Sequence, residues 1–246
     1  MDVDAVAADL DAALRDAGTA ARAWKEKLYL KSDLEFYGAT LPAMRQLVKR
    51  FAADQPDLER GDLLALVRAL WDEPVHERRV VAVLLLERFE VLLEPVDLDR
   101  IGQLLRESKT WALVDNLATS VAGPLLDRTP SADEVLDAWA ADDDFWIRRS
   151  ALLAHLGPLR AGQGDFQRFC RYADEMLEEK EFFIRKAIGW VLRDTARKRP
   201  HLVYEWIAPR THRASGVTVR EVVKRLPEDR AAEVLGAYRA GRPVSS

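Results

Sequence analysis

The sequence has few of the residues that interrupt helices and only one cysteine. Among its 246 residues are 12 glycines and 11 prolines, and the cysteine is Cys170. A single cysteine has no intramolecular partner, which excludes a disulfide-stabilised scaffold, and we interpret Cys170 as a small buried hydrophobic residue. The scarcity of glycine and proline favours helices over strands. The hydrophobic content of 48% excludes a mainly disordered chain.

Long hydrophobic runs are also lacking. The longest, Val80–Leu86, has seven residues, far fewer than the roughly 20 that a membrane-spanning helix needs. The amino terminus, Met1 to Asp4, is acidic where a secretory signal carries positive charge. The sequence shows no histidine or cysteine at metal-ligand spacing and no glycine-rich phosphate loop. We therefore expect a cytoplasmic protein without membrane association, metal or cofactor.

Charge is distributed unevenly along the chain. Residues 1–144 carry 17 basic and 29 acidic residues, whereas residues 145–246 carry 20 basic and 12 acidic residues. Nine of the basic residues lie within residues 193–225. Such a region can bind a polyanion although the formal net charge is −4, because the field near a surface follows the local charges. A solvated helix face explains the same charges, so charge alone does not distinguish a polyanion-binding surface from an ordinary one.

A repeat organises the helical pattern. Residues 145–152 (FWIRRSAL) resemble residues 182–189 (FFIRKAIG), and residues 75–82 are a looser copy. The second basic position of this motif recurs with spacings of 34, 36, 34, 37 and 34 residues, as Arg45, Arg79, Asp115, Arg149, Lys186 and Arg220. Such a series predicts an all-α solenoid of about six helical-hairpin repeats. We expect one domain over residues 1–240 and a flexible tail over residues 241–246.

Five of the six repeated positions are basic, and the exception is Asp115. If these positions face the inner curve of the solenoid, they form a row of cations suited to the phosphates of a duplex. The alternative is that each cation pairs with an acid in the neighbouring repeat. A carboxylate in this row would repel phosphate. Its presence is explained if Asp115 contacts a positively charged group.

Two tryptophans are associated with the acidic position. Trp111 precedes Asp115 by four residues, so both project from one face of a helix, one turn apart. Trp190 follows Lys186 by the same interval. Indole faces attract cations, and a carboxylate can stabilise an oxocarbenium-like centre or orient water toward it. Taken singly, each tryptophan is also consistent with core packing, and Asp115 with an inter-repeat salt bridge.

These segments resemble those of a known family. Residues 181–193 (EFFIRKAIGWVLR) resemble the hallmark segment of the AlkD-like DNA alkylation repair family of HEAT-like-repeat DNA glycosylases, and residues 109–115 (KTWALVD) resemble its catalytic helix. Residues 146–151, 29–31, 36–38 and 220–224 are similar to further family motifs. The resemblance runs from about residue 20 to about residue 227. One departure is Thr110, where the family often has a second tryptophan.

The resemblance implies a right-handed superhelix with a concave DNA-binding face. It also implies a monofunctional glycosylase that excises cationic N3- and N7-alkylated purines from double-stranded DNA. Asp115 would then be the catalytic carboxylate, with Trp111 and Trp190 flanking the deoxyribose. We expect a monomer whose remaining DNA contacts are made by Tyr29, Arg149, Lys186, Arg193, Arg220 and Lys224. The alternative is a catalytically inactive module that binds DNA structures or a protein partner.

Overall fold

The structure is a computed structural model that describes residues 1–129 and 133–244. The described residues form helices and no strand, apart from one isolated β-bridge between Glu35 and Val75. The predicted all-α class is confirmed. By its internal packing the chain divides into a first unit, Met1–Leu117, and a second unit, Ala118–Ser246. The expectation of a single domain over residues 1–240 stays a prediction.

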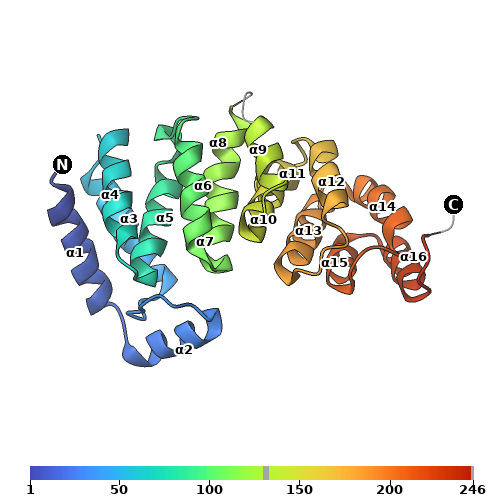
Figure 1. The fold of residues 1–246 in the computed structure, drawn as a ribbon, viewed down its shortest axis with the longest axis horizontal. Coiled ribbons are helices and arrows are strands. Elements are labelled where there is room, and N and C mark those ends of the chain that lie inside the picture. The colour runs from blue at the N-terminus through green and yellow to red at the C-terminus, as the bar shows by residue number, and fades with distance from the viewer. Residues whose placement is uncertain (130–132, 245–246) are drawn as a thin grey trace. The chain divides into compact units, whose positions relative to one another are not determined.

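The first unit is built around α5 (Figure 1), which packs against α3, α4 and α7. Val81 to Leu86 are all buried, because the apolar run of α5 lies between helices rather than on one face. The helices of this unit are α1 (Val3–Asp16), α2 (Ala20–Leu30), α3 (Leu41–Asp54), α4 (Arg60–Asp72), α5 (His76–Arg88), α6 (Asp97–Ser108) and α7 (Trp111–Asn116), with a 3-10 turn at Glu90–Leu92.

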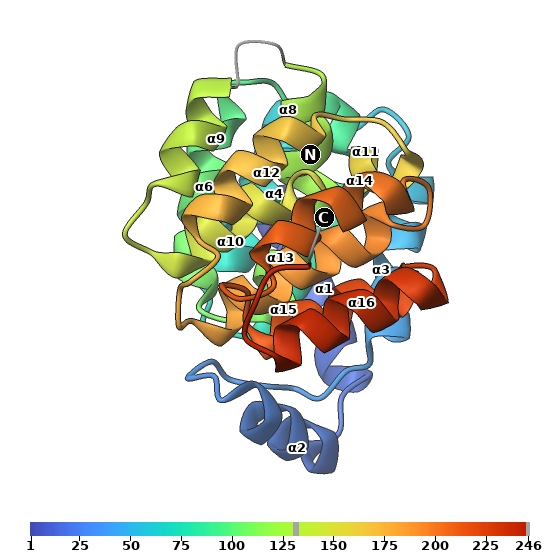
Figure 2. The ribbon, with the colours of Figure 1, turned by 90° about the vertical axis from the view of Figure 1, so that its right-hand side faces the viewer.

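Helix α2 differs from the other helices of the first unit. None of its residues is buried, and it lies apart from α1 and α3 (Figure 2). Trp24, Leu28 and Tyr29 expose 66%, 56% and 73% of their surfaces. Tertiary packing normally stabilises a helix of this length, and α2 has little of it.

The second unit is built around α13, which packs against α10, α11, α14 and α15. Its helices are α8 (Gly123–Asp127), α9 (Asp133–Ala140), α10 (Phe145–Leu153), α11 (Leu156–Ala161), α12 (Phe166–Glu175), α13 (Phe182–Thr195), α14 (Pro200–Ile207), α15 (Gly216–Val222) and α16 (Glu228–Arg239), with 3-10 turns at Ala208–Arg210 and Val223–Arg225. Cys170 on α12 is 7% exposed, and burial raises the pKa of its thiol to about 12. This confirms the interpretation of Cys170 as a buried residue.

Polar contacts repeat at the interval that the sequence predicts. In both units, side chains 34 to 37 residues apart are joined by hydrogen bonds. The pairs are Arg60–Asp97, Trp71–Glu107, Arg160–Asp194, Arg168–Asp133, Arg171–Asp137, Lys186–Glu221 and Arg210–Asp174. A residue therefore meets its counterpart in the next hairpin, as stacked repeats require.

The first basic position of the repeated motif has a structural role. Arg148 donates to both carboxylate oxygens of Glu179, at 3.0 and 2.8 Å, and to the carbonyl of Asp142. Arg185 donates to the carbonyl of Glu179 at 2.6 Å. These guanidinium groups close the loops that join the hairpins, which explains why one of the two adjacent basic residues recurs.

None of the helices in the described part of the chain combines the length and hydropathy that a membrane span requires. Of the predicted tail, residues 245–246 lie outside the described residues, and the backbone N–H of Val244 donates to the carbonyl of Ala208 at 2.9 Å.

Candidate functional site

Helix α7 carries the predicted catalytic pair. Trp111 opens the helix and Asp115 follows one turn later, and both side chains are half-buried, so each reaches solvent. Two residues separate this helix from α6, and the first of them, Lys109, has a left-handed φ of 48°. For a residue other than glycine this backbone conformation costs roughly 1–2 kcal/mol. Strain of this kind concentrates at functional sites, where the surrounding structure holds it in place.

Tyr29 lies against the same helix. Its ring meets Trp111 edge-on, with ring centroids 6.1 Å apart and an interplanar angle of 88°. Tyr29 comes from the exposed helix α2, which ends at Leu30 and is followed by Lys31 with a left-handed φ of 50°. The structure therefore brings together Tyr29, Trp111 and Asp115 on the surface of the first unit, and we call these three residues the aromatic–acid group.

A buried carboxylate that sequence reasoning missed holds the loop after α2. Glu77 is fully buried and accepts hydrogen bonds from the backbone N–H groups of Tyr37, at 3.0 Å, and Gly38, at 2.6 Å. Gly38 has a φ of +82°, and a Cβ there would lie 2.2 Å from the carbonyl oxygen of Thr19. The loop is thus fixed to α5 and to the start of α2, which sets the position of Tyr29.

The seven tryptophans separate into three classes. Trp24 is exposed, Trp111 and Trp190 are half-buried, and the other four are buried. The buried four are Trp71, Trp139, Trp146 and Trp206. Core packing therefore accounts for four of the indoles, and the two that the family resemblance marks are the two that are half-buried.

In the second unit, one face of α13 presents Lys186, Trp190 and Arg193, which are three or four residues apart and so neighbours on the helix surface. Gly189 lies on the same side, toward α15. A Cβ at Gly189 would lie 2.8 Å from Cβ of Glu221 and 3.2 Å from Cα of Thr218. The glycine therefore permits the close approach of α15 that brings Glu221 to this face.

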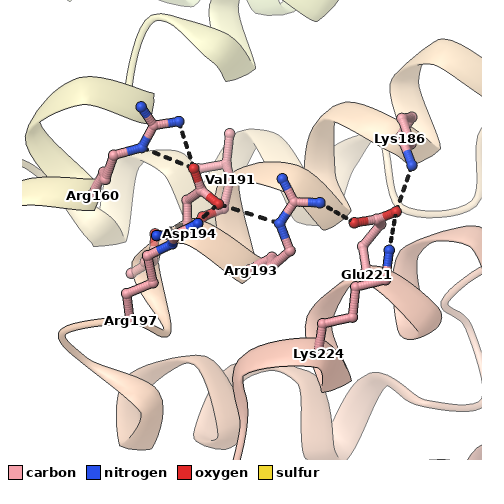
Figure 3. A network of polar contacts seen from close by, with 9 residues as sticks. Arg160, Lys186, Val191, Arg193, Asp194, Arg197, Glu221 and Lys224 are labelled. Atoms are coloured by element: carbon pink, nitrogen blue, oxygen red, sulfur yellow. Dashed lines mark hydrogen bonds and ion pairs between the residues drawn. The ribbon is translucent and has the colours of Figure 1, made fainter.

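Glu221 is the centre of a group of ion pairs (Figure 3). Its side chain is 5% exposed and contacts Nζ of Lys186 at 2.5 Å, Nζ of Lys224 at 2.9 Å and the guanidinium of Arg193. Burial raises the pKa of a carboxyl group, but the hydrogen bonds from the two lysines and the charge of Arg193 outweigh burial and hold the pKa of Glu221 at about 2. Glu221 is therefore ionised at every physiological pH.

A second buried carboxylate extends these contacts. Asp194, with a side chain 3% exposed, accepts from Nη2 of Arg160 at 2.5 Å and Nε of Arg193 at 3.2 Å, and lies 3.8 Å from Nε of Arg197. Arg193 therefore bridges Asp194 and Glu221 (Figure 3). We call these seven residues the Glu221–Asp194 cluster, in which five cations (Arg160, Lys186, Arg193, Arg197 and Lys224) surround two anions.

The remaining predicted phosphate contacts differ in exposure. Arg149 is only 2% exposed, and its guanidinium donates to the carbonyl of Phe183 in the following repeat. A phosphate contact by Arg149 stays a prediction, and it requires the guanidinium to leave this buried position. Arg220 is exposed and forms no ion pair with any residue that the structure describes. Lys186 forms an ion pair with Glu221 of the next repeat, which is the alternative role expected for the repeated cations.

The aromatic–acid group belongs to the first unit, whereas Trp190 and the Glu221–Asp194 cluster belong to the second. The convergence of Trp111, Asp115 and Trp190 on one deoxyribose therefore stays a prediction.

Comparison with known proteins supports one family. The model of the family described as "DNA alkylation repair enzyme" matches residues 10–226. No curated protein matches the chain. The chain is similar to the solved structure of a "Predicted DNA alkylation repair enzyme" from Enterococcus faecalis, with 22% identity, a TM-score of 0.73, and coverage of 86% of this chain and 97% of that one.

Two structures from Streptococcus mutans are also similar. AlkD2 shares 17% identity with a TM-score of 0.59, covering 74% of this chain and 90% of that chain. The protein smu.31 shares 17% identity with a TM-score of 0.57, covering 75% and 100%. At these identities the likeness shows the fold, which is that of helical-repeat proteins.

Proposed function

The chain belongs to the family of DNA alkylation repair enzymes. We propose that it is a monofunctional DNA glycosylase that acts in base excision repair in the cytoplasm, where it associates with the nucleoid. Its substrates are cationic N3- and N7-alkylated purines in duplex DNA, and the bond that it hydrolyses is the N-glycosidic bond. The observation that carries this proposal is the solvent-accessible pair of Trp111 and Asp115, one turn apart on α7 and flanked by Tyr29.

The chemistry suits a site with a single carboxylate. Alkylation at N3 or N7 makes the purine a cation, so the base leaves as a neutral molecule and needs no general acid. As the bond breaks, positive charge develops on the deoxyribose, and the carboxylate of Asp115 stabilises it or orients the attacking water. The faces of Trp111 and Trp190 attract the same cationic sugar.

The binding of DNA is supported by the charges of the second unit. The cations of the Glu221–Asp194 cluster outnumber its anions by three, and most expose a large part of their side chains, such as 40% for Lys186 and 54% for Lys224. Such a local excess attracts the phosphate backbone although the chain as a whole is acidic. Arg220, exposed on α15, adds a further cation.

Release of N7-methylguanine from a duplex tests the proposal. We expect the wild-type protein to release the free base and leave an abasic site without cleaving the strand. Asp115→Asn is expected to lose this activity, whereas Asp99→Asn, which changes an exposed acid of the same unit and shifts the net charge equally, is expected to retain it. Tight binding by the wild type without release would instead identify the protein as the inactive DNA-binding module.

A further inference from the structure

Glu221 in the Glu221–Asp194 cluster is contacted by three cations. Lys186 and Arg193 come from α13, and Lys224 comes from the 3-10 turn that follows α15. The carboxylate is buried, with 5% of its side chain exposed, whereas the three cations expose 40%, 24% and 54% of theirs. The anion therefore lies beneath the surface and the cations lie on it.

Electrostatics explain what the buried anion does. Three cations that contact one carboxylate repel one another, and such repulsion is weakly screened where side chains are partly buried. Glu221 compensates for one of the three charges, so it holds the cations together and leaves an excess of two. An anion that arrives from solvent with one negative charge per group, such as a phosphodiester, meets donors that are already in place.

We propose that Glu221 is a positioning residue, which together with Asp194 holds Lys186, Arg193 and Lys224 as a preformed phosphodiester-binding site beside Trp190. This inference rests on the proposed function, because it takes the phosphodiester to be that of the DNA substrate. Lys186 and Arg193 lie one turn before and one turn after Trp190 on α13, and their charged groups converge on the two carboxylate oxygens of Glu221. The cations that Glu221 positions would thus hold a backbone phosphate next to a deoxyribose at Trp190.

The test compares two variants of equal net charge. Glu221→Gln removes the buried anion, and Glu228→Gln removes an exposed acid at the start of α16, so each adds one positive charge. Binding of a short undamaged duplex is measured by fluorescence anisotropy over a series of salt concentrations. We expect Glu221→Gln to bind about tenfold more weakly than Glu228→Gln, with a salt slope about one unit smaller, because at least one phosphate contact is lost.

Equal or tighter binding by folded Glu221→Gln overturns the proposal, since Glu221 then only neutralises charge and joins the two helices. If thermal melting shows that Glu221→Gln is unfolded, Glu221→Asp decides instead. This variant keeps the charge but withdraws the carboxylate by one methylene, and we expect weaker binding than the wild type, whereas unchanged binding overturns the proposal. Base release by the wild-type protein is scored separately, so a failure of the glycosylase proposal is distinguishable from a failure of this one.

Discussion

In the first unit, a half-buried carboxylate stands one turn from a tryptophan, whereas in the second unit two buried carboxylates are surrounded by five cations. Glu221 is buried and its two carboxylate oxygens are occupied by three cations, which hold its pKa at about 2. Asp115 reaches solvent beside Trp111, where a developing cation can approach it. We therefore assign different tasks to two similar side chains on one type of repeat: the proposed role of Asp115 is chemistry, and that of Glu221 is positioning.

Glu77 is a third buried carboxylate, and it binds backbone N–H groups instead of cations. Glu77→Gln presents an amide N–H₂ group to donors that need an acceptor, and we expect a loss of about 2–3 kcal/mol in the free energy of unfolding. Thermal or urea melting measures this loss. The exposed Glu73→Gln is the matched control, and a Glu77→Gln variant as stable as this control would contradict the role assigned to Glu77.

Each unit contains one buried histidine, so the stability of both units is expected to depend on pH. Burial lowers the pKa of His76 and of His155 to about 4, below the value of about 6.5 in an unfolded chain. The unfolded chain therefore binds protons first, and stability is complete above about pH 6.5 and is lost as the pH falls toward 4. Each histidine is expected to cost on the order of 1–2 kcal/mol by pH 5.

The free energy of unfolding, measured by urea denaturation at pH 7 and pH 5, checks this expectation. His76→Phe, which keeps the stacking on Phe36, should reduce the loss between the two pH values, and the exposed His201→Phe should not. An equal loss in wild type and His76→Phe would show that His76 is not the group that titrates.

The two half-buried tryptophans are expected to act on binding and on rate together, because an indole face attracts the cationic lesion as well as the transition state. Trp111→Ala and Trp190→Ala should each weaken lesion binding by about 0.5–2 kcal/mol and raise the activation free energy of excision by a similar amount. Melting curves of the two variants show whether they are folded. The buried Trp139→Ala is the control, since it should lose stability without a specific effect on lesion recognition. Unchanged lesion binding in Trp190→Ala would remove that residue from the site.

The smallest effect is expected at Arg220. Because this side chain is exposed, Arg220→Ala should leave stability nearly unchanged, weaken duplex binding similarly for every sequence and lower the salt slope by about one unit. Arg149→Ala should differ, because its guanidinium donates to the carbonyl of Phe183 and its loss affects stability. A salt slope in Arg220→Ala equal to that of the wild type would exclude Arg220 from the DNA footprint.

The sequence predicted the repeat and the pairing of Trp111 with Asp115, but not the buried carboxylates. Periodicity reveals stacked repeats because each hairpin contacts the next, and the observed pairs, such as Lys186–Glu221, have the predicted spacing. An acidic residue within an amphipathic helix is expected to be solvated, so nothing in the sequence indicated individually that Glu77, Asp194 and Glu221 are buried. A usable signal existed for two of them, since each lies 34 or 35 residues after a basic residue with which it pairs.

The site as a whole could be predicted only in part, for a geometrical reason. Trp111 and Asp115 share a helix face whatever the tertiary structure, because four residues make about one turn. The contact between Tyr29 and Trp111 depends on the loop that Glu77 holds and on the space that Gly38 leaves for Thr19. Such contacts between distant segments follow from packing, which periodicity does not encode.

We propose that the charge of Asp115 acts in the transition state, and the excision rate of Asp115→Asn under single-turnover conditions at saturating protein measures this effect. The amide keeps the shape and removes the charge, so we expect a rate of N7-methylguanine release lower by about two decades or more, equivalent to about 3 kcal/mol, with the affinity for the duplex nearly unchanged. Excision at the wild-type rate by a folded Asp115→Asn variant would instead show that Asp115 is a structural residue.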